Sequence, residues 1–216
     1  LLMIGCSGDD GADSGSHADA EVEPLDLPAD PAAAGVVVGV KTVDVSGVTV
    51  EVWYPAADSA AGQPTDLVDV GVFVPTSVRD VLGDLPLGGW DSGAVRDAAV
   101  RNTGEAFPVV VFSHGFGAFR TQSTDLTVHL ASRGYVVVAA DHPGRMLGDV
   151  LPCLFTPALD GCDLSGFGSD PAPGHVATVM DWLDAGAQGT DLGDSLDLDR
   201  MGIFGHSAGG GTTTTV

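Results

Sequence analysis

The chain has 216 residues and a strongly acidic composition, with 8 Lys and Arg against 30 Asp and Glu and a formal net charge of −22. Nucleic acid and anionic membrane surfaces repel such a chain, so neither is expected as a direct partner. The length suffices for one sizeable core, and nothing in the sequence calls for a second domain.

The first 33 residues predict an export leader followed by a tether. Leu1 to Cys6 has the apolar character of the end of a signal segment. Met3-Ile4-Gly5-Cys6 resembles a bacterial lipobox, which predicts a lipid on Cys6. We therefore expect an exported protein, anchored through Cys6 to a membrane at the cell surface or in the periplasm. An ordinary secretory signal or a buried cysteine is the alternative. Residues 7–33 hold eight acids and no Lys or Arg, which predicts a flexible tether before one domain over 34–216.

The pattern over residues 36–54 predicts a β-hairpin that turns at Ser46-Gly47, because apolar and polar residues alternate on both sides of this pair. The next stretch is less regular. Here we expect a strand over Leu67 to Val74 and short helices over Ser77 to Leu82 and Asp91 to Val100.

From Phe107 the sequence predicts a strand, a helix and a second strand. The apolar runs 107–112 and 135–140 have the length and composition of buried strands. Between them, residues 123–133 form the expected helix, with Leu126 and Leu130 one turn apart and Gly134 at its end. Strands joined by a helix in this way lie parallel in a sheet that is buried on both faces.

A long loop with two cysteines is expected after this unit, before a helix over 174–183 that carries Val176, Val179 and Leu183 on one face. If Cys6 is lipidated, Cys153 and Cys162 remain as an even pair, which predicts a disulfide in an oxidising compartment. A ring of this size contributes roughly 2.5 to 3 kcal/mol by chain entropy. Two free thiols are the alternative, and the spacing of the pair fits no zinc-binding pattern.

Gly205-His206-Ser207-Ala208-Gly209 has the Gly-x-Ser-x-Gly pattern of a nucleophile elbow. In such an elbow the serine occupies a strained turn between a strand and a helix, and the preceding residues 199–204 predict a short buried strand. Ser207 is therefore the candidate nucleophile, with Gly205 and Gly209 allowing the tight turn. A serine at the start of a glycine-rich helix is the alternative.

A second signal for the same chemistry follows the strand 107–112, where Ser113-His114-Gly115-Phe116-Gly117 has the form of the loop that completes an oxyanion hole. Elbow geometry makes the Ala208 N–H one donor. Residues 107–144, with 39–43 and 50–55 before them, resemble the platelet-activating factor acetylhydrolase group and its bacterial esterase and dienelactone-hydrolase-like relatives. The resemblance extends from about residue 36 to residue 210.

This resemblance implies an α/β-hydrolase fold with a mostly parallel central sheet and helices on both faces. It also implies that the N–H of Phe116 is the second oxyanion donor, and that the substrates are short-acyl or lipid-like esters or polyesters. His114 and Gly115 would shape the loop, and His206 would pack around the elbow.

A serine hydroxyl needs a histidine base that an acid orients, and in this fold both follow the nucleophile in the chain. No histidine and no acid follows Ser207. We therefore expect a domain truncated after the elbow and inactive as it stands. The remaining histidines are expected to be structural or solvent-facing: His17, His129, His142 and His175.

The sequence as a whole predicts a serine carboxylic ester hydrolase that forms an acyl-enzyme and requires no metal or organic cofactor. The alternative is a non-catalytic, truncated surface lipoprotein of the same fold that binds a ligand. An Asp and then a His in downstream coding sequence would favour the enzyme, and a genuine stop codon would favour the binding protein.

Overall fold

The structure is a computed structural model of the whole chain. The residues that it describes are Glu23, 25–28, Asp30, 33–84, 87–155, Cys162, Leu164 and 168–216. The predicted signal remnant with Cys6, and most of the predicted tether with His17, lie outside these residues.

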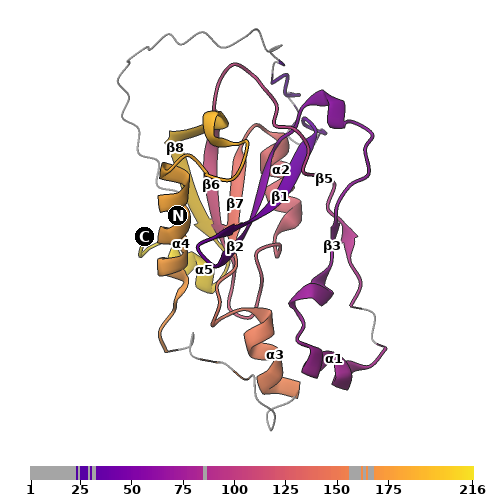
Figure 1. Ribbon diagram of the computed structural model, residues 1–216, viewed down its shortest axis with the longest axis vertical. Coiled ribbons are helices and arrows are strands. Elements are labelled where there is room, and N and C mark those ends of the chain that lie inside the picture. Colours follow the sequence, from indigo (N-terminus) through magenta and orange to yellow (C-terminus); the bar gives the residue numbers. More distant parts are fainter. Residues whose placement is uncertain are drawn as a thin grey trace.

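A six-stranded sheet in the order β5-β1-β2-β7-β6-β8 forms the centre of the molecule (Figure 1). Strands β6, β7 and β8 run parallel to one another, and β2 pairs antiparallel with both β1 and β7. The strands are β1 Val38–Val45, β2 Val48–Pro55, β5 Val95–Arg96, β6 Phe107–Ser113, β7 Val136–Ala140 and β8 Leu196–Gly205. The predicted strands 107–112 and 135–140 are thus adjacent and parallel.

The β1–β2 hairpin turns where the sequence predicts. Ser46 and Gly47 both have positive φ, 52° and 85°, as a two-residue turn that matches the twist of the flanking strands requires. The Asp44 carboxylate accepts the Gly47 N–H at 3.0 Å. This local chemistry aligns Val45 with Val48 and sets the register of the whole hairpin.

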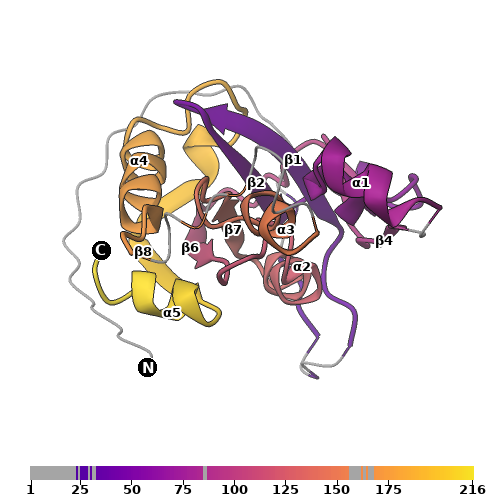
Figure 2. The same ribbon diagram turned by 90° about the horizontal axis from the view of Figure 1, so that it is seen from below.

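Helices cover both faces of the sheet, as Figure 2 shows with α4 and α2 on opposite sides. Helix α4, Ala172–Asp184, buries Val176, Val179 and Leu183 against one face, which agrees with the predicted helix face. Helix α2, Thr124–Ser132, packs Ala131 against the other face. The two faces separate because successive strand residues point to opposite sides of a sheet.

The buried face of α2 differs from the predicted one in Leu126, whereas Leu130 packs against the cluster that contains Ala131. Leu126 is 46% exposed, whereas Thr124, Thr127 and Ala131 are buried. The hydroxyls of both threonines are satisfied within the turn, since Thr124 donates to the Thr121 carbonyl and Thr127 to the Thr124 carbonyl. Small side chains on this face allow the helix to lie close to β1, β2 and β7.

The stretch between β2 and β6 contains small elements: the 3₁₀ helices Asp58–Ala60 and Val70–Phe73, β3 Leu67–Val68, α1 Thr76–Leu82 and β4 Trp90–Asp91. The predicted strand over Leu67 to Val74 is wrong beyond Val68, because the Asp69 carboxylate accepts the Gly71 N–H and begins a 3₁₀ turn. The predicted helix over Asp91 to Val100 is also wrong. Asp91 accepts the Gly93 N–H and Gly93 has a φ of 74°, so the chain turns and enters strand β5.

Two further elements differ from the prediction. The expected cysteine loop begins with helix α3, Leu147–Phe155, which contains Cys153. The Asp149 carboxylate accepts the N–H groups of Gly144 and Met146 and so fixes the turn that leads into this helix. Strand β8 is longer and less buried than the predicted strand 199–204, because β6 is its one neighbour among the described strands.

The described part of the predicted tether lies against the domain. Leu25 packs on the apolar cluster beneath α4, and the Glu23 N–H donates to the Asn102 carbonyl. The Arg133 guanidinium donates to the carbonyls of Pro28 and Ala33. An apolar side chain and backbone carbonyls thus give these residues partners on the domain, and the flexible tether stays a prediction. Of the helices that the structure describes, none is long and apolar enough to span a membrane.

Candidate active site

Ser207 stands at a sharp turn between β8 and helix α5, Ala208–Thr212. Its backbone has φ 53° and ψ −117°, a region that residues with a Cβ rarely occupy. A strained serine at a strand-to-helix turn is the conformation of a nucleophile elbow. The residue is exposed, so its hydroxyl faces solvent rather than the core.

The two glycines of the motif lie where the backbone passes closest to itself. A Cβ on Gly205 would come within 2.3 Å of the Gly209 backbone. A Cβ on Gly209 would come within 2.0 Å of the Ser113 carbonyl oxygen. Both distances are far shorter than any normal contact, so the turn can form only if both positions lack a side chain.

The loop after β6 lies directly against this turn. A Cβ on Gly115 would be 3.0 Å from the His206 Nδ1 and 3.4 Å from the Ser207 Cβ. The His206 N–H also donates to the Ser113 carbonyl at 3.1 Å. Because β6 and β8 are parallel neighbours, the segments that follow them meet at the same edge of the sheet.

Hydrogen bonds hold the loop from several directions. The N–H of Gly115 donates to the Gln122 side-chain oxygen at 3.0 Å, and the N–H of Gly117 donates to the Arg145 carbonyl at 2.8 Å. The Leu147 N–H donates to the Ala118 carbonyl at 2.8 Å. The loop is thus fastened both to the segment before α2 and to the start of α3.

The histidines near the site are held by other partners. His114 is fully buried: its Nδ1 lies 2.7 Å from the Gly115 carbonyl oxygen, and its Nε2 accepts the His142 N–H at 3.1 Å. The Nδ1 must therefore carry the hydrogen, and the ring is neutral. Burial lowers the pKa of His114 to about 4.

His142 is equally buried, with its Nε2 2.9 Å from the Ser113 hydroxyl, and burial followed by its neighbour His114 lowers its pKa. Its ring also stacks on that of His175, with the centroids 5.7 Å apart. Ser113 and His142 form a serine–histidine pair, but neither side chain is accessible, so the pair has no route to a substrate. Among the described residues, no side chain is hydrogen-bonded to the Ser207 hydroxyl.

Arg145 is a fully buried cation directly beneath the loop. Its guanidinium donates to the His114 carbonyl at 2.7 Å and to the Ser113 hydroxyl at 2.9 Å. On the other side it donates to the Asp170 carboxylate at 2.6 Å and to the Thr212 hydroxyl at 3.1 Å. Burial lowers the pKa of Arg145, and the charge of Asp170 opposes this shift. One side chain therefore links β6, the loop and helix α5.

The comparisons with known proteins agree with this geometry. The family model of platelet-activating factor acetylhydrolase, isoform II, matches residues 40–146, which include the loop but not the elbow. The platelet-activating factor acetylhydrolase of Bos taurus is 28% identical over 165 residues, which cover 62% of this chain and 37% of that protein. That of Cavia porcellus is 48% identical over 139 residues, which cover 51% and 31%. The chain thus spans about a third of the length of these relatives.

A solved structure extends the match over more of the chain. A ferulic acid esterase from Streptomyces cinnamoneus aligns with a TM-score of 0.57 and 27% identity, covering 91% of this chain and 58% of that one. Over residues 40–146 the chain is similar to platelet-activating factor acetylhydrolase, isoform II, and its fold is that of an α/β-hydrolase. The expected fold class, with its mostly parallel sheet, is thereby confirmed.

Within this α/β-hydrolase, the structure brings together the loop and the elbow that the sequence had separated by some ninety residues. Gly115 lies against His206 and Ser207, and the His114 carbonyl lies against Gly209, as expected for two halves of one site. Sequence reasoning missed two polar residues of the same site, Gln122 and Arg145. The sequence offered one weak indication for Arg145. The chain has only 8 Lys and Arg, so each of them is a candidate partner for buried polar groups.

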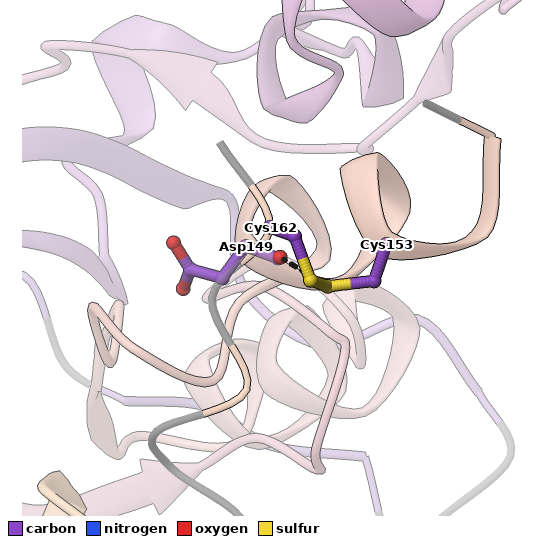
Figure 3. The surroundings of a disulfide bond; sticks show 3 residues. All are labelled: Asp149, Cys153 and Cys162. Carbon is purple, nitrogen blue, oxygen red and sulfur yellow. Dashed lines mark hydrogen bonds between the residues drawn. A yellow bond between two sulfur atoms is a disulfide. The ribbon is translucent and has the colours of Figure 1, made fainter. Parts of the chain in front are cut away.

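The Cys153–Cys162 disulfide predicted for this α/β-hydrolase is formed in the structure (Figure 3). Cys153 lies on α3, and its sulfur is 3.8 Å from the Asp149 backbone oxygen, a contact without a hydrogen because a disulfide sulfur carries none. Since the start of α3 is bonded to the Ala118 carbonyl, the disulfide fastens the helix that supports the loop.

Charged groups also fix the segment after the loop. The Arg120 guanidinium donates to the carboxylates of Glu51 and Asp141, at 2.9 and 2.7 Å, and the Arg120 N–H donates to Asp141 at 2.8 Å. Burial raises the pKa of Asp141, and the charge of Arg120 opposes this. Within the part of the chain that the structure describes, no three His, Cys, Asp or Glu side chains are grouped so as to hold a metal ion.

Proposed function

We propose that this protein is a serine carboxylic ester hydrolase in which Ser207 is the nucleophile and the N–H groups of Phe116 and Ala208 stabilise the oxyanion. The observation that carries this proposal is the strained backbone of Ser207, with its exposed side chain, packed against the Gly115 loop. Backbone strain of this kind clusters at functional sites, where it is part of the mechanism.

The reaction follows the acyl-enzyme route. The Ser207 hydroxyl attacks the ester carbonyl carbon while a base takes its proton, and the carbonyl oxygen becomes the oxyanion. Collapse of this intermediate expels the alcohol, and water then releases the acid from the serine. Each backbone donor aimed at the oxyanion is worth about 3 to 4 kcal/mol of transition-state stabilisation.

The base is neither His114 nor His142, since both are buried and hydrogen-bonded elsewhere. In α/β-hydrolases the base and its orienting acid follow the nucleophile in the chain. We therefore expect residues 1–216 alone to show no serine-dependent turnover.

The substrate classes that we propose are taken from the names of the relatives. An acetylhydrolase and a ferulic acid esterase both act on esters by name, which supports short-acyl or lipid-like esters, with polyesters as a related class. The oxyanion chemistry is the same for all of these, so a small chromogenic ester such as p-nitrophenyl butyrate is a suitable test substrate.

A fluorophosphonate probe tests the proposal directly. In the complete natural protein the probe should label Ser207, and Ser207→Ala should abolish both labelling and ester turnover. Ser59→Ala, which changes another exposed serine, is the matched control and should retain both. Labelling that persists in Ser207→Ala would remove the assignment.

We further propose that the protein is exported and carries a lipid on Cys6. The disulfide supports export, because such bonds persist in oxidising compartments. Mass spectrometry of the natively expressed protein should find a diacylglyceryl group on Cys6. An unmodified Cys6 in a soluble secreted product would reject the anchor and leave the proposed catalysis untouched.

A further inference from the structure

Gln122 lies between the two halves of the proposed site. It precedes Ser123, the residue that caps helix α2, and its side chain is half-buried. Its amide contacts the loop on one side and the elbow on the other, through Gly115 and His206. These two partners are 91 positions apart in the sequence, and each stands directly before a residue of the proposed reaction centre.

The orientation of the amide follows from its partners. The Gly115 N–H can only donate, so the atom 3.0 Å away must be the Gln122 oxygen. The Gln122 nitrogen then faces the His206 Nδ1 at 2.8 Å. Because an amide nitrogen can only donate, this Nδ1 accepts, and the neutral His206 ring carries its hydrogen on Nε2.

The two bonds set the spacing of the oxyanion donors. Gly115 immediately precedes Phe116, and His206 immediately precedes Ser207 and stands two residues before Ala208. The segments are already in close contact, since a Cβ on Gly115 would be 3.0 Å from the His206 Nδ1. A single amide that bonds both segments therefore limits how far the loop can move from the elbow.

We propose that Gln122 is a positioning residue that keeps the Phe116 and Ala208 N–H groups at a fixed separation and holds His206 in its Nε2–H form. The proposal rests on the function proposed above. Gln122 acts through Gly115 and His206 and is not itself a catalytic residue. Arg145 also bonds the loop, but from the buried side, whereas Gln122 bonds it from the side that carries the exposed elbow.

The test uses the complete natural protein with Gln122→Ala, Gln122→Glu and a matched control, Gln63→Ala. Gln63 is an exposed glutamine in the segment before β3, and its amide donates to the Ser59 carbonyl at 2.9 Å. Steady-state kinetics with p-nitrophenyl butyrate, the rate of fluorophosphonate labelling and the melting temperature are measured for each. Nitrogen-15 NMR reads which ring nitrogen of His206 carries the hydrogen.

Gln122→Ala should lower kcat and the labelling rate about 10- to 100-fold while KM changes less than about threefold, because misplaced oxyanion donors weaken the transition state more than the bound ester. Gln63→Ala should match the wild type in every readout. Gln122→Glu keeps an oxygen for the Gly115 N–H, so it should recover part of kcat. The second carboxylate oxygen in Gln122→Glu cannot donate a hydrogen bond to the His206 Nδ1, because it can only accept one. The His206 ring should therefore carry its hydrogen on Nδ1 in this variant.

The outcomes separate this proposal from the proposed function. If the wild type labels at Ser207 and Gln122→Ala retains kcat within about twofold, the positioning role is overturned and the enzyme assignment stands. An unchanged His206 tautomer in Gln122→Glu would overturn the bridge in the same way. If the wild type neither labels nor turns over ester, both proposals fall together.

Discussion

The loop after β6 and the turn after β8 start from parallel neighbouring strands but are held in different ways. The turn is held by backbone contact: Gly205 and Gly209 bring main chains so close that no side chain fits between them. The loop is held by hydrogen bonds: the Gln122 and Arg145 side chains bond its N–H and carbonyl groups, in addition to backbone bonds with Arg145 and Leu147. Strand burial differs as well, since β6 is mostly buried and β8 is half-exposed.

One site therefore contains a rigid part, the turn at Ser207, and a part whose stability can be changed gradually, the loop after β6. Main-chain contact leaves no freedom to the strained serine, whereas hydrogen bonds from side chains can be tuned by substitution. The elbow should therefore respond to substitution in an all-or-none way, and the loop in graded steps. Four changes test this contrast, from the largest expected effect to the smallest.

Gly209→Ala should be the most damaging change. The new methyl group would lie 2.0 Å from the Ser113 carbonyl oxygen, so β6 and α5 must separate, and we expect a loss of at least about 4 kcal/mol in unfolding free energy. Urea unfolding measures it. Gly211→Ala, in the same helix with no atom within 4 Å of its Cβ, should instead stabilise by about 0.5 to 1 kcal/mol. Equal effects at both positions would contradict the backbone-contact account.

Arg145→Met should destabilise the protein by about 3 kcal/mol, because it leaves buried acceptors on β6 and the loop without their donor. Asp170 is 36% exposed and can rehydrate, which limits the loss. Arg200→Met is the control, since this arginine is 59% exposed and its pair with Asp197 should contribute under about 0.5 kcal/mol. A loss at Arg145 no larger than that at Arg200 would show that side chains do not hold the loop.

Replacing both Cys153 and Cys162 by serine should cost about 2.5 kcal/mol, from the larger chain entropy of the unfolded state. Amide hydrogen exchange should rise in α3 and at the Leu147 N–H, which donates to the loop. A reducing agent should reproduce the change in the wild type and have no effect on the double variant. Exchange that rises evenly over the molecule would mean that the disulfide does not support the loop in particular.

Acid should weaken the buried side of the loop. The folded pKa of His114 is about 4, below the ordinary value of 6.5, so the unfolded state binds the proton more readily. Stability is therefore full above pH 6.5 and falls as the pH drops toward 4, with roughly 2 kcal/mol lost at pH 5 from this residue. His114→Gln should flatten the pH dependence, and His129→Gln, on the exposed face of α2, should not. Parallel pH curves for wild type and His114→Gln would contradict the assignment.

Local patterns predicted much of the fold. The hairpin, strands β6 and β7 and helix α4 follow from alternation, apolar runs and a three-to-four residue repeat. The prediction was wrong where a short polar bond decides the conformation, as when Asp69 starts a 3₁₀ turn inside an apolar run. It was also wrong for Leu126 on α2, which is exposed while threonines with satisfied hydroxyls are buried; Leu130 packs as predicted.

The site divides in the same way. Gly205, Ser207 and Gly209 were predicted because their spacing is a property of one short segment. Gln122 and Arg145 were not, because their partners lie far along the chain: Gln122 and His206 are separated by 84 positions. The parallel pairing of β6 with both β7 and β8 brings these groups together, and no local pattern encodes the pairing of β6 with β8.

At Ser207, the residue that would make the turn most stable is not the residue that the proposed reaction needs. Glycine adopts φ 53° and ψ −117° without the penalty of about 1 to 3 kcal/mol that a residue with a Cβ incurs, so the turn would fold more readily with glycine there. A lineage under selection for stability alone would lose the hydroxyl. Under the proposed function, Ser207 keeps a reactive hydroxyl at the expense of stability.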